Sequence, residues 1–393
     1  MTDVEAAKRA ACAAIDAVAD ELVAISHDIH ARPELGYEER YASGRLAAAL
    51  ADHGIAVEHP AFGIETSFAG RIGDGDGPLV AVCCEYDALP GIGHGCGHNV
   101  IAASGAGAAI GLAAVAGDCG GRALVLGTPA EELNGGGKIR LLRAGAFDGV
   151  DVAMMAHPEM GDVERVPYLA ADTVEVVFHG RAAHASSSPH KGLNALDAVV
   201  AAYNGIAMLR QHTQPDEKVH GIITDGGQAE NTIPARAAAR WKVRARTRDR
   251  LERLKARVTA CFDGAAAQTG CTYEATWEGG YADVRANRAL AAAYRRNGES
   301  LGRTFVDPDL VPIHVAGSTD MGDVSHVVPS IHPALRACPP GTPGHSVEMT
   351  AAAVSGLADR AVVDGAKMLA MTAIDVWLRP ELLDEVRREF SSA

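Results

Sequence analysis

The sequence of 393 residues is short of basic charge and has no long uninterrupted apolar run. Its 36 lysines and arginines face 50 aspartates and glutamates, and a formal net charge of −14 argues against nucleic acid and anionic membranes as partners. The longest apolar stretches are rich in alanine and glycine and too interrupted to span a bilayer. Residues 1–5 lack the basic start and apolar core of a signal peptide, so we expect a cytoplasmic protein.

The remaining composition is that of a soluble globular enzyme, with 48% hydrophobic and 22% charged residues. The length favours two domains over a single core. Eight cysteines are scattered along the chain, and seven of them fit small buried residues in a reducing compartment. Cys96 is the exception, because it lies among glycines and histidines.

The first part of the chain alternates between helical patterns and continuous apolar runs of strand length. This alternation predicts an α/β fold with a mixed sheet flanked by helices. We expect a further strand over 309–315 and a long closing helix over 350–378. The predicted strands are 79–84, 123–126 and 152–156, and the predicted helices are 6–30, 37–53, 99–116 and 138–143.

The middle of the chain has a different rhythm, with the order β-α-β-β-α-β of a ferredoxin-like unit. We expect an inserted domain over 171–283, and a discontinuous catalytic domain formed by 1–170 and 284–393. The expected strands are 173–179, 219–224, 235–245 and 271–277, and the expected helices are 194–210 and 248–268.

Acidic and imidazole side chains follow each predicted strand of the first part. Glu85 and Asp87 follow the first strand, Glu131 and Glu132 the second, and His157 the third. Because ligand sites in open α/β sheets lie beyond the carboxyl ends of the strands, we expect these groups to converge.

Cys96 and His98 add a thiol and an imidazole, the ligand types that suit zinc and neighbouring metals. A site for two metal ions needs about five protein ligands, one of them bridging, and a thiolate can bridge. Glu131 then remains as a general base, and Asp87 could orient a ligand imidazole. The five candidate ligands are Cys96, His98, Glu132, His157 and His345.

The motifs of the chain together resemble the M20 family of metallopeptidases and amidohydrolases. The similarity is to its aminoacylase and carboxypeptidase branch, and within that branch to the p-aminobenzoyl-glutamate hydrolase and dipeptidase-like group. The motifs occur in the family's order and cover most of the chain. They are residues 29–39 (IHARPELGYEE), 85–90 (EYDALP), 94–99 (HGCGHN), 129–132 (PAEE), 183–186 (AHAS), 231–234 (NTIP), 317–325 (GSTDMGDVS) and 341–346 (GTPGHS).

The resemblance implies two divalent metal ions, zinc or manganese, on the five ligands, with Glu131 as the base. It implies that the inserted domain dimerises, that His184 reaches into the partner's site to stabilise the oxyanion, and that Asn231 and Arg244 hold the substrate carboxylate. His326 stands where close relatives often carry tryptophan, which affects substrate detail. The implied substrate is an N-acyl or N-aminoacyl amino acid, either p-aminobenzoyl-glutamate-like or a dipeptide.

Two other functions stay open from the sequence. Cys96 could be the nucleophile of a cysteine hydrolase, although this leaves Glu132, His157 and His345 without a role. A catalytically silent metal-binding protein is the second alternative, against which the intact Glu131 argues.

Several prominent residues have simple structural interpretations. His94 suits a supporting or structural role, and Arg244 could be a solvated residue at a strand end. Glu34, Glu38 and Glu39 are most simply a solvated helix start.

Overall fold

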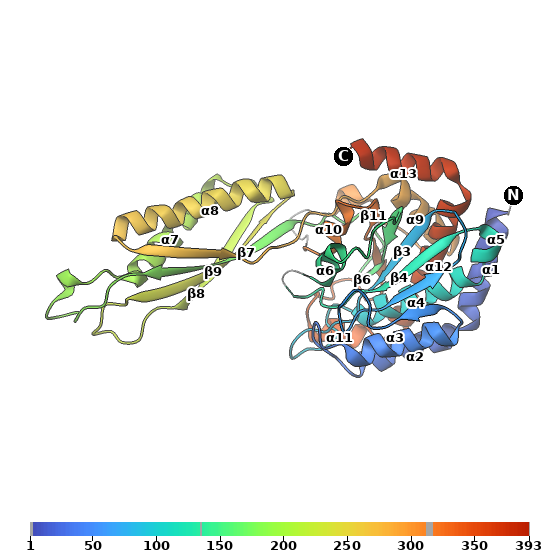
Figure 1. The fold of residues 1–393 in the computed structure, drawn as a ribbon, viewed down its shortest axis with the longest axis horizontal. Coiled ribbons are helices and arrows are strands. Elements are labelled where there is room, and N and C mark those ends of the chain that lie inside the picture. The colour runs from blue at the N-terminus through green and yellow to red at the C-terminus, as the bar shows by residue number, and fades with distance from the viewer. Residues whose placement is uncertain (1–2, 134–135, 312–316, 393) are drawn as a thin grey trace. The chain divides into compact units, whose positions relative to one another are not determined.

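A computed structural model describes residues 3–133, 136–311 and 317–392 of the chain. Within these residues the chain forms two compact units (Figure 1). The larger unit comprises 3–166, 284–311 and 320–392, and the smaller comprises 167–283 and 317–319. No helix in the described ranges is both long and apolar enough to cross a membrane.

The larger unit contains the predicted mixed sheet, which confirms the α/β fold class. Strands β4, β3, β5 and β11 are parallel, because helices return the chain between them, whereas β1 and β2 join antiparallel at one edge. The sheet order is β1 (Ala56–Glu58), β2 (Ala69–Ile72), β4 (Arg122–Gly127), β3 (Leu79–Cys84), β5 (Val152–Met154) and β11 (Ser330–Ile331).

Helices surround this sheet, and two of the predicted helices are divided. The pattern over 6–30 gives two helices because Val18 leaves the helical region and its N–H bonds to the Ile15 carbonyl. The closing helix is also two helices, since Ser355 caps the second at its start. The helices of this unit are α1 (Val4–Ala17), α2 (Ala19–His30), α3 (Arg40–Asp52), α4 (His98–Ala113), α5 (Ala116–Cys119), α6 (Gly137–Arg143), α9 (Arg288–Ser300), α10 (Met321–Ser325), α11 (Val347–Ala352), α12 (Gly356–Leu378) and α13 (Pro380–Ser392).

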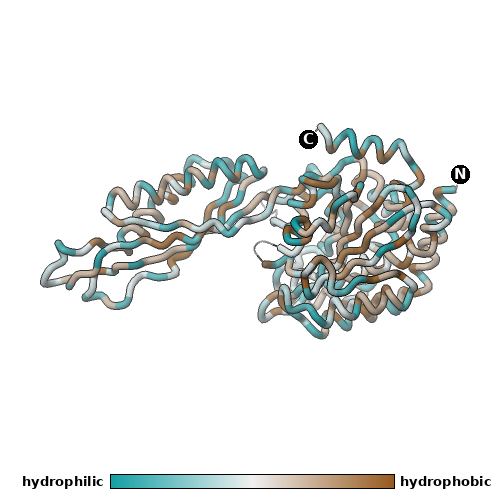
Figure 2. Tube along the Cα trace, viewed as in Figure 1, coloured by the Kyte–Doolittle hydropathy of each residue, from teal (hydrophilic) through white to brown (hydrophobic). Residues whose placement is uncertain are grey.

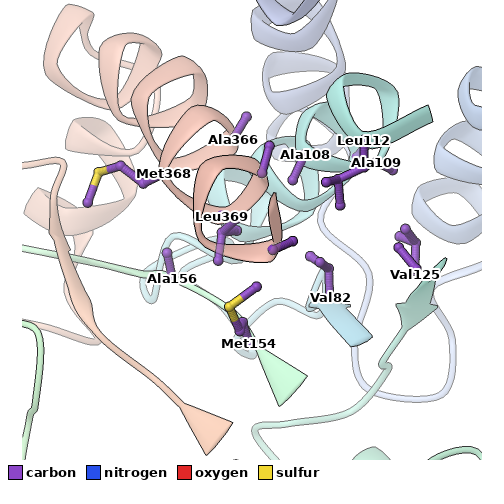
Figure 3. Close-up of a cluster of buried hydrophobic side chains, with 14 of the residues drawn as sticks. Val82, Ala108, Ala109, Leu112, Val125, Met154, Ala156, Ala366, Met368 and Leu369 are labelled. Atoms are coloured by element: carbon purple, nitrogen blue, oxygen red, sulfur yellow. The ribbon is translucent and has the colours of Figure 1, made fainter. Parts of the chain in front are cut away.

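The core of the larger unit lies where α4 and α12 pack beside the central strands (Figure 3). Residues 98–112 of α4 are all buried, and most are small. A Cβ at Gly107 would lie 2.8 Å from the Cβ of Ala366 on α12, so glycine is required for this close approach. The small residues therefore bring α4, which begins at His98, deep into the unit.

The smaller unit has the predicted β-α-β-β-α-β order and its own apolar core, which includes Phe178, Trp241 and Phe262. Its antiparallel sheet has the order β10-β7-β9-β8, the arrangement of a ferredoxin-like unit. Figure 2 shows polar residues along much of α8. The elements are β7 (Ala170–His179), α7 (Ala195–Leu209), β8 (Lys218–Asp225), β9 (Arg236–Ala245), α8 (Arg248–Thr269) and β10 (Thr272–Trp277).

Two findings differ from the sequence predictions. Most of the strand expected over 309–315 lies outside the described residues. Its first two positions belong to a short 3-10 helix, Pro308–Leu310. A two-stranded parallel ribbon, β6 (His157–Glu159) with β12 (Ala334–Arg336), was not predicted. It fixes the backbone of His157, whose N–H bonds to the Pro333 carbonyl at 2.9 Å.

Candidate metal centre

The side chains that follow β3, β4 and β5 do converge at the carboxyl edge of the sheet. Asp87 follows β3, Glu131 and Glu132 follow β4, and His157 begins β6 just beyond β5. The Asp87 carboxylate accepts two hydrogen bonds at 2.9 Å, from His98 Nδ1 and from the backbone N–H of Glu132. The buried Asp87 carboxylate therefore holds both the His98 ring at the start of α4 and the turn after β4.

The glycine-rich segment before α4 brings Cys96 to His157. Gly97 has φ +75°, and a Cβ there would lie 2.7 Å from Pro158 Cγ, so only glycine permits this path. The loop packs directly on β6 as a result. Cys96 Sγ lies 3.4 Å from His157 Nε2, and the imidazoles of His98 and His157 meet edge to face with centroids 6.0 Å apart.

His345 joins the same cluster from the loop before α11. Its backbone N–H bonds to the Gly95 carbonyl at 2.9 Å, and its φ is +55°. Its Nε2 lies 3.3 Å from Glu132 Oε1. A histidine in the left-handed region is uncommon, and such backbone conformations concentrate at functional sites.

The ligand-type atoms form overlapping groups, in each of which all atoms lie within 4.8 Å of one another. Cys96, His98 and Glu132 each belong to two of the groups, so the groups form one continuous cluster. The groups are Cys96 with His98 and His157, Cys96 with Glu132 and His345, and His98 with Glu131 and Glu132.

His98 supplies the sharpest test of whether a metal ion fits. Its Nδ1 is bonded to Asp87, so the ring in its neutral form, which a bound metal ion would select, presents a lone pair at Nε2. That buried Nε2 has no hydrogen-bond partner among the described residues and lies 3.4 Å from Glu85 Oε2 and 3.9 Å from Glu132 Oε1. An acceptor nitrogen facing carboxylate oxygens fits a cation, so the donor set suits a metal ion.

The two adjacent glutamates differ in their ionisation. Burial raises the pKa of Glu131 well above its ordinary value, and the charges of Glu85, Asp320 and Glu132 add to the effect. Burial also acts on Glu132, but its bond to His345 and the charge of His98 lower its pKa overall. A carboxyl group with raised proton affinity beside an ionised carboxylate is suited to accept and return a proton.

A buried ion network behind the cluster was missed by the sequence analysis. Lys138 on α6 is fully buried, and its Nζ lies 2.5 Å from Glu85 Oε1 and 2.7 Å from Asp320 Oδ1. Burial alone would lower the pKa of Lys138, but these two carboxylates raise it. Glu85 lies in the motif over 85–90. The sequence around Lys138 gave no indication of its burial, because its partners come from distant segments.

Three further histidines were singled out or lie near the cluster. His332 is buried, with its ring centroid 5.4 Å from that of His157. His94 is buried and stacks on His30, and burial lowers its pKa to about 3, so it lies outside the three ligand groups as a neutral packing residue. His326 ends α10.

The interpretation of Glu34, Glu38 and Glu39 as a solvated helix start is wrong for Glu39. This side chain is fully buried, and its Oε1 accepts a hydrogen bond from the Ala130 N–H at 2.8 Å. Glu34 accepts the N–H groups of Tyr41 and Ala42 at the start of α3, and Glu38 is exposed. The burial of Glu39 depends on a segment about ninety residues away, so the local sequence could not reveal it.

In the smaller unit, the structure brings His184 next to Asn231. Ala185 N–H bonds to the Asn231 carbonyl, and His184 pairs with Thr232 in an isolated bridge. His184 Nδ1 lies 3.2 and 3.3 Å from the backbone N–H groups of Ser186 and Ser187, which donate to it. The ring is thereby directed to carry its proton on Nε2, as a hydrogen-bond donor.

Arg244 lies elsewhere in the smaller unit. It is near the far end of β9, eight residues beyond Arg236, so roughly 25 Å of extended strand separates it from the Asn231 end. Arg244 Nη1 donates to Ser318 Oγ at 2.8 Å, and burial lowers its pKa. The structure therefore does not bring Asn231 and Arg244 of one chain together, and their joint binding of the substrate carboxylate stays a prediction.

Comparison with known sequences gives matches over nearly the whole chain. Residues 170–270 match the peptidase dimerisation domain of M20 proteins. The Xaa-Arg dipeptidase of Mus musculus is 42% identical, over 99% of this chain and 93% of its own length. A p-aminobenzoyl-glutamate hydrolase polypeptide of Escherichia coli (strain K12) is 29% identical, over 96% of this chain and 93% of its own.

Solved structures share the fold. A dinuclear metal-binding M20 peptidase from Bacillus subtilis superposes with a TM-score of 0.72 at 21% identity, over 92% of this chain and 99% of its own. An aminobenzoyl-glutamate utilization protein from Klebsiella pneumoniae gives a TM-score of 0.73 at 20% identity, over 93% and 98%. At these identities the likeness establishes the architecture.

Proposed function

The chain belongs to the M20 family of metallopeptidases and amidohydrolases, and we propose that it hydrolyses dipeptides that carry arginine at the carboxyl end. It is a metal-dependent amidohydrolase by family, and the substrate is inferred from the Xaa-Arg dipeptidases of Mus musculus and Homo sapiens, which are 42% and 40% identical. One observation carries the proposal: five ligand-type side chains gather beside a glutamate of raised pKa.

We propose that Cys96, His98, Glu132, His157 and His345 hold two divalent ions, zinc or manganese. Such ions, when bound, polarise the scissile carbonyl and make water acidic enough to lose a proton near neutral pH. Glu131 takes that proton and delivers it to the leaving nitrogen. Asp87 keeps the His98 ring oriented through Nδ1.

The smaller unit supplies the remaining groups in this proposal. His184 donates from Nε2 to the developing oxyanion, and the Arg244 guanidinium holds the substrate carboxylate. Within one chain, His184 and Asn231 lie at the opposite end of β9 from Arg244. They can therefore act on the same substrate as Arg244 only if they come from a partner subunit. The dimerisation domain supports such a homodimer. We further propose a cytoplasmic location, in accord with eight free cysteines.

The cysteine-hydrolase alternative has little physical support. Burial raises the pKa of the Cys96 thiol, whereas a nucleophilic cysteine requires a lowered pKa. A metal ion would reverse this by binding the thiolate, so the half-buried position of Cys96 beside His157 suits a ligand.

The decisive experiment is a hydrolysis screen with the purified, metal-loaded protein. We expect Ala-Arg to be cleaved with a higher kcat/KM than Ala-Glu or p-aminobenzoyl-glutamate, and chelation to abolish turnover until metal is returned. A preference for p-aminobenzoyl-glutamate would reject the dipeptide assignment while retaining the amidohydrolase. Turnover that survives complete metal removal would reject the metal mechanism.

A further inference from the structure

We propose that Glu39 is a positioning residue for the general base, and that it acts by clamping the backbone of the turn that carries Glu131. This inference rests on the proposed function, because it takes Glu131 as the base. It gives a role to the motif over 29–39, which otherwise contributes nothing to the chemistry described above.

The first observation is the hydrogen bond from the Ala130 N–H to Glu39 Oε1, 2.8 Å long and fully buried. Asp87 Oδ2 accepts the N–H of Glu132 at 2.9 Å. Two buried carboxylates therefore hold the amides on either side of Glu131. Hydrogen bonds to ionised carboxylates are shorter and stronger than neutral ones, so this pair is well suited to fix the turn.

The second observation is that the clamped residue has an unfavourable backbone conformation. Ala130 has φ +59°, in the left-handed region that disfavours alanine. A residue in this region keeps its conformation only when its surroundings enforce it. Without the bond to Glu39, relaxation of Ala130 toward negative φ would rotate the peptide that leads into Glu131.

The third observation is that the segment around Glu39 packs directly against the same turn. A Cβ at Gly36 would lie 2.9 Å from the Ala130 Cβ and 2.8 Å from Leu133 Cδ1. The Glu34 carbonyl accepts the Ala88 N–H at 2.8 Å, beside Asp87. The segment 34–39 thus contacts two turns, the one that carries Glu131 and the one that carries Asp87.

The burial of Glu39 has an energetic cost that a solvated helix start would not bear. Desolvation raises the pKa of Glu39 to about 7, and the charge of Asp87 adds to the increase, while the bond from Ala130 opposes it. A glutamine of the same shape would avoid most of this cost, but it would accept the Ala130 N–H through a weaker, neutral hydrogen bond.

The test compares Glu39→Met with Glu38→Met, the same chemical change on an exposed neighbour. Methionine has nearly the length of glutamate but no oxygen to accept the Ala130 N–H, whereas a glutamine oxygen would still accept it. We expect Glu39→Met to lower kcat by about ten- to a hundredfold, the scale of an ångström-sized misplacement, with KM and bound metal unchanged. Glu38→Met should match the wild type. Unchanged kcat in Glu39→Met would overturn the proposal, and so would a loss of metal that accounts for the lost activity.

A second variant separates positioning from a merely structural role. Glycine tolerates φ +59°, so Ala130→Gly should change the wild-type kcat by less than about threefold yet restore much of the kcat that Glu39→Met loses. Independent, multiplicative effects of the two substitutions would overturn the proposal. If Glu39→Met does not fold, Glu39→Asp, which retracts the carboxylate by one methylene, replaces it in the same comparison.

Hydrogen exchange supplies a readout that needs no substrate. Amides over 128–133 should exchange faster in metal-loaded Glu39→Met than in the wild type, and those of α12 should not change. Unchanged exchange over 128–133 would overturn the clamp even if no dipeptide were a substrate. Faster exchange together with no hydrolysis by the wild type would reject the proposed function and leave the clamp standing.

Discussion

At the scale of single residues, the adjacent Glu131 and Glu132 lie in environments that shift their pKa values in opposite directions. Burial and the charges of neighbouring carboxylates raise the pKa of Glu131, whereas the bond to His345 and the charge of His98 outweigh burial and lower the pKa of Glu132. One peptide bond thus separates a group suited to exchange protons from a group suited to remain a charged ligand.

This difference predicts opposite outcomes for one substitution made at two positions. Glu131→Gln should keep its metal and lose about two to four orders of magnitude in kcat, the usual range for removal of a general base. Glu132→Gln should lose metal. Metal content by elemental analysis, measured beside single-turnover rates, decides the matter, and loss of metal from Glu131→Gln would mean that the two roles are exchanged.

Lys138 permits a prediction about stability that is separate from activity. Lys138→Met would leave Glu85 and Asp320 as buried carboxylates without their cation, which should lower the free energy of unfolding by roughly 3–5 kcal/mol. Urea denaturation of the metal-free protein measures this quantity.

The double variant Lys138→Met/Asp320→Asn should recover part of that loss, because it removes one of the uncompensated charges. Lys191→Met changes an exposed lysine and should be neutral. Equal stability of Lys138→Met and Lys191→Met would show that the buried network contributes nothing.

At the scale of elements, the site is built where short segments meet the ends of the central strands. The start of α4 packs on β6, and β6 is held by β12, so the Cys96 and His157 side chains meet through a ribbon outside the main sheet. Gly97 is the contact point, since its missing Cβ lets the loop approach Pro158.

Gly97→Ala should therefore weaken metal binding by about 10- to 100-fold, as disturbed support of metal ligands commonly does. Gly91→Ala is the matched control, because Gly91 has nearly the same φ, +77°, but no atom within 4 Å of an added Cβ. Both variants incur the backbone cost of about 1–2 kcal/mol, but only in Gly97→Ala would the added methyl group clash with Pro158 of β6. Similar metal affinities in the two variants would contradict this account.

At the scale of the whole molecule, the separation of His184 and Asn231 from Arg244 along one chain favours an active site shared between subunits. In that arrangement each site takes Glu131 from one chain and His184 from its partner. The dimerisation domain is then part of the catalytic machinery as well as an interface.

Complementation tests this directly. When inactive His184→Ala and inactive Glu131→Gln proteins are mixed equally and exchange subunits, half of the dimers should carry one intact site, which gives about a quarter of wild-type activity. Subunit exchange is verified with labelled chains. Absence of activity in verified heterodimers would place His184 in the site of its own chain.

Much of this organisation was accessible from the sequence, because its signals are local. Apolar runs of strand length, each followed by acidic or imidazole residues, were enough to predict the sheet and the edge at which Asp87, Glu131 and His157 gather. The alternating pattern over 171–283 likewise predicted the ferredoxin-like unit, since the period of side chains along a strand or helix is a property of consecutive residues.

Only the tertiary structure decided which charged groups are buried and which residues can act together. Glu39 was indistinguishable from the exposed Glu38 in the sequence, and Lys138 had no local partner, because their burial arises from segments distant along the chain. The separation of Asn231 and Arg244 follows from the extended length of β9, although Arg244 is only thirteen positions after Asn231. Solvation and proximity depend on long-range packing, which sequence periodicity does not encode.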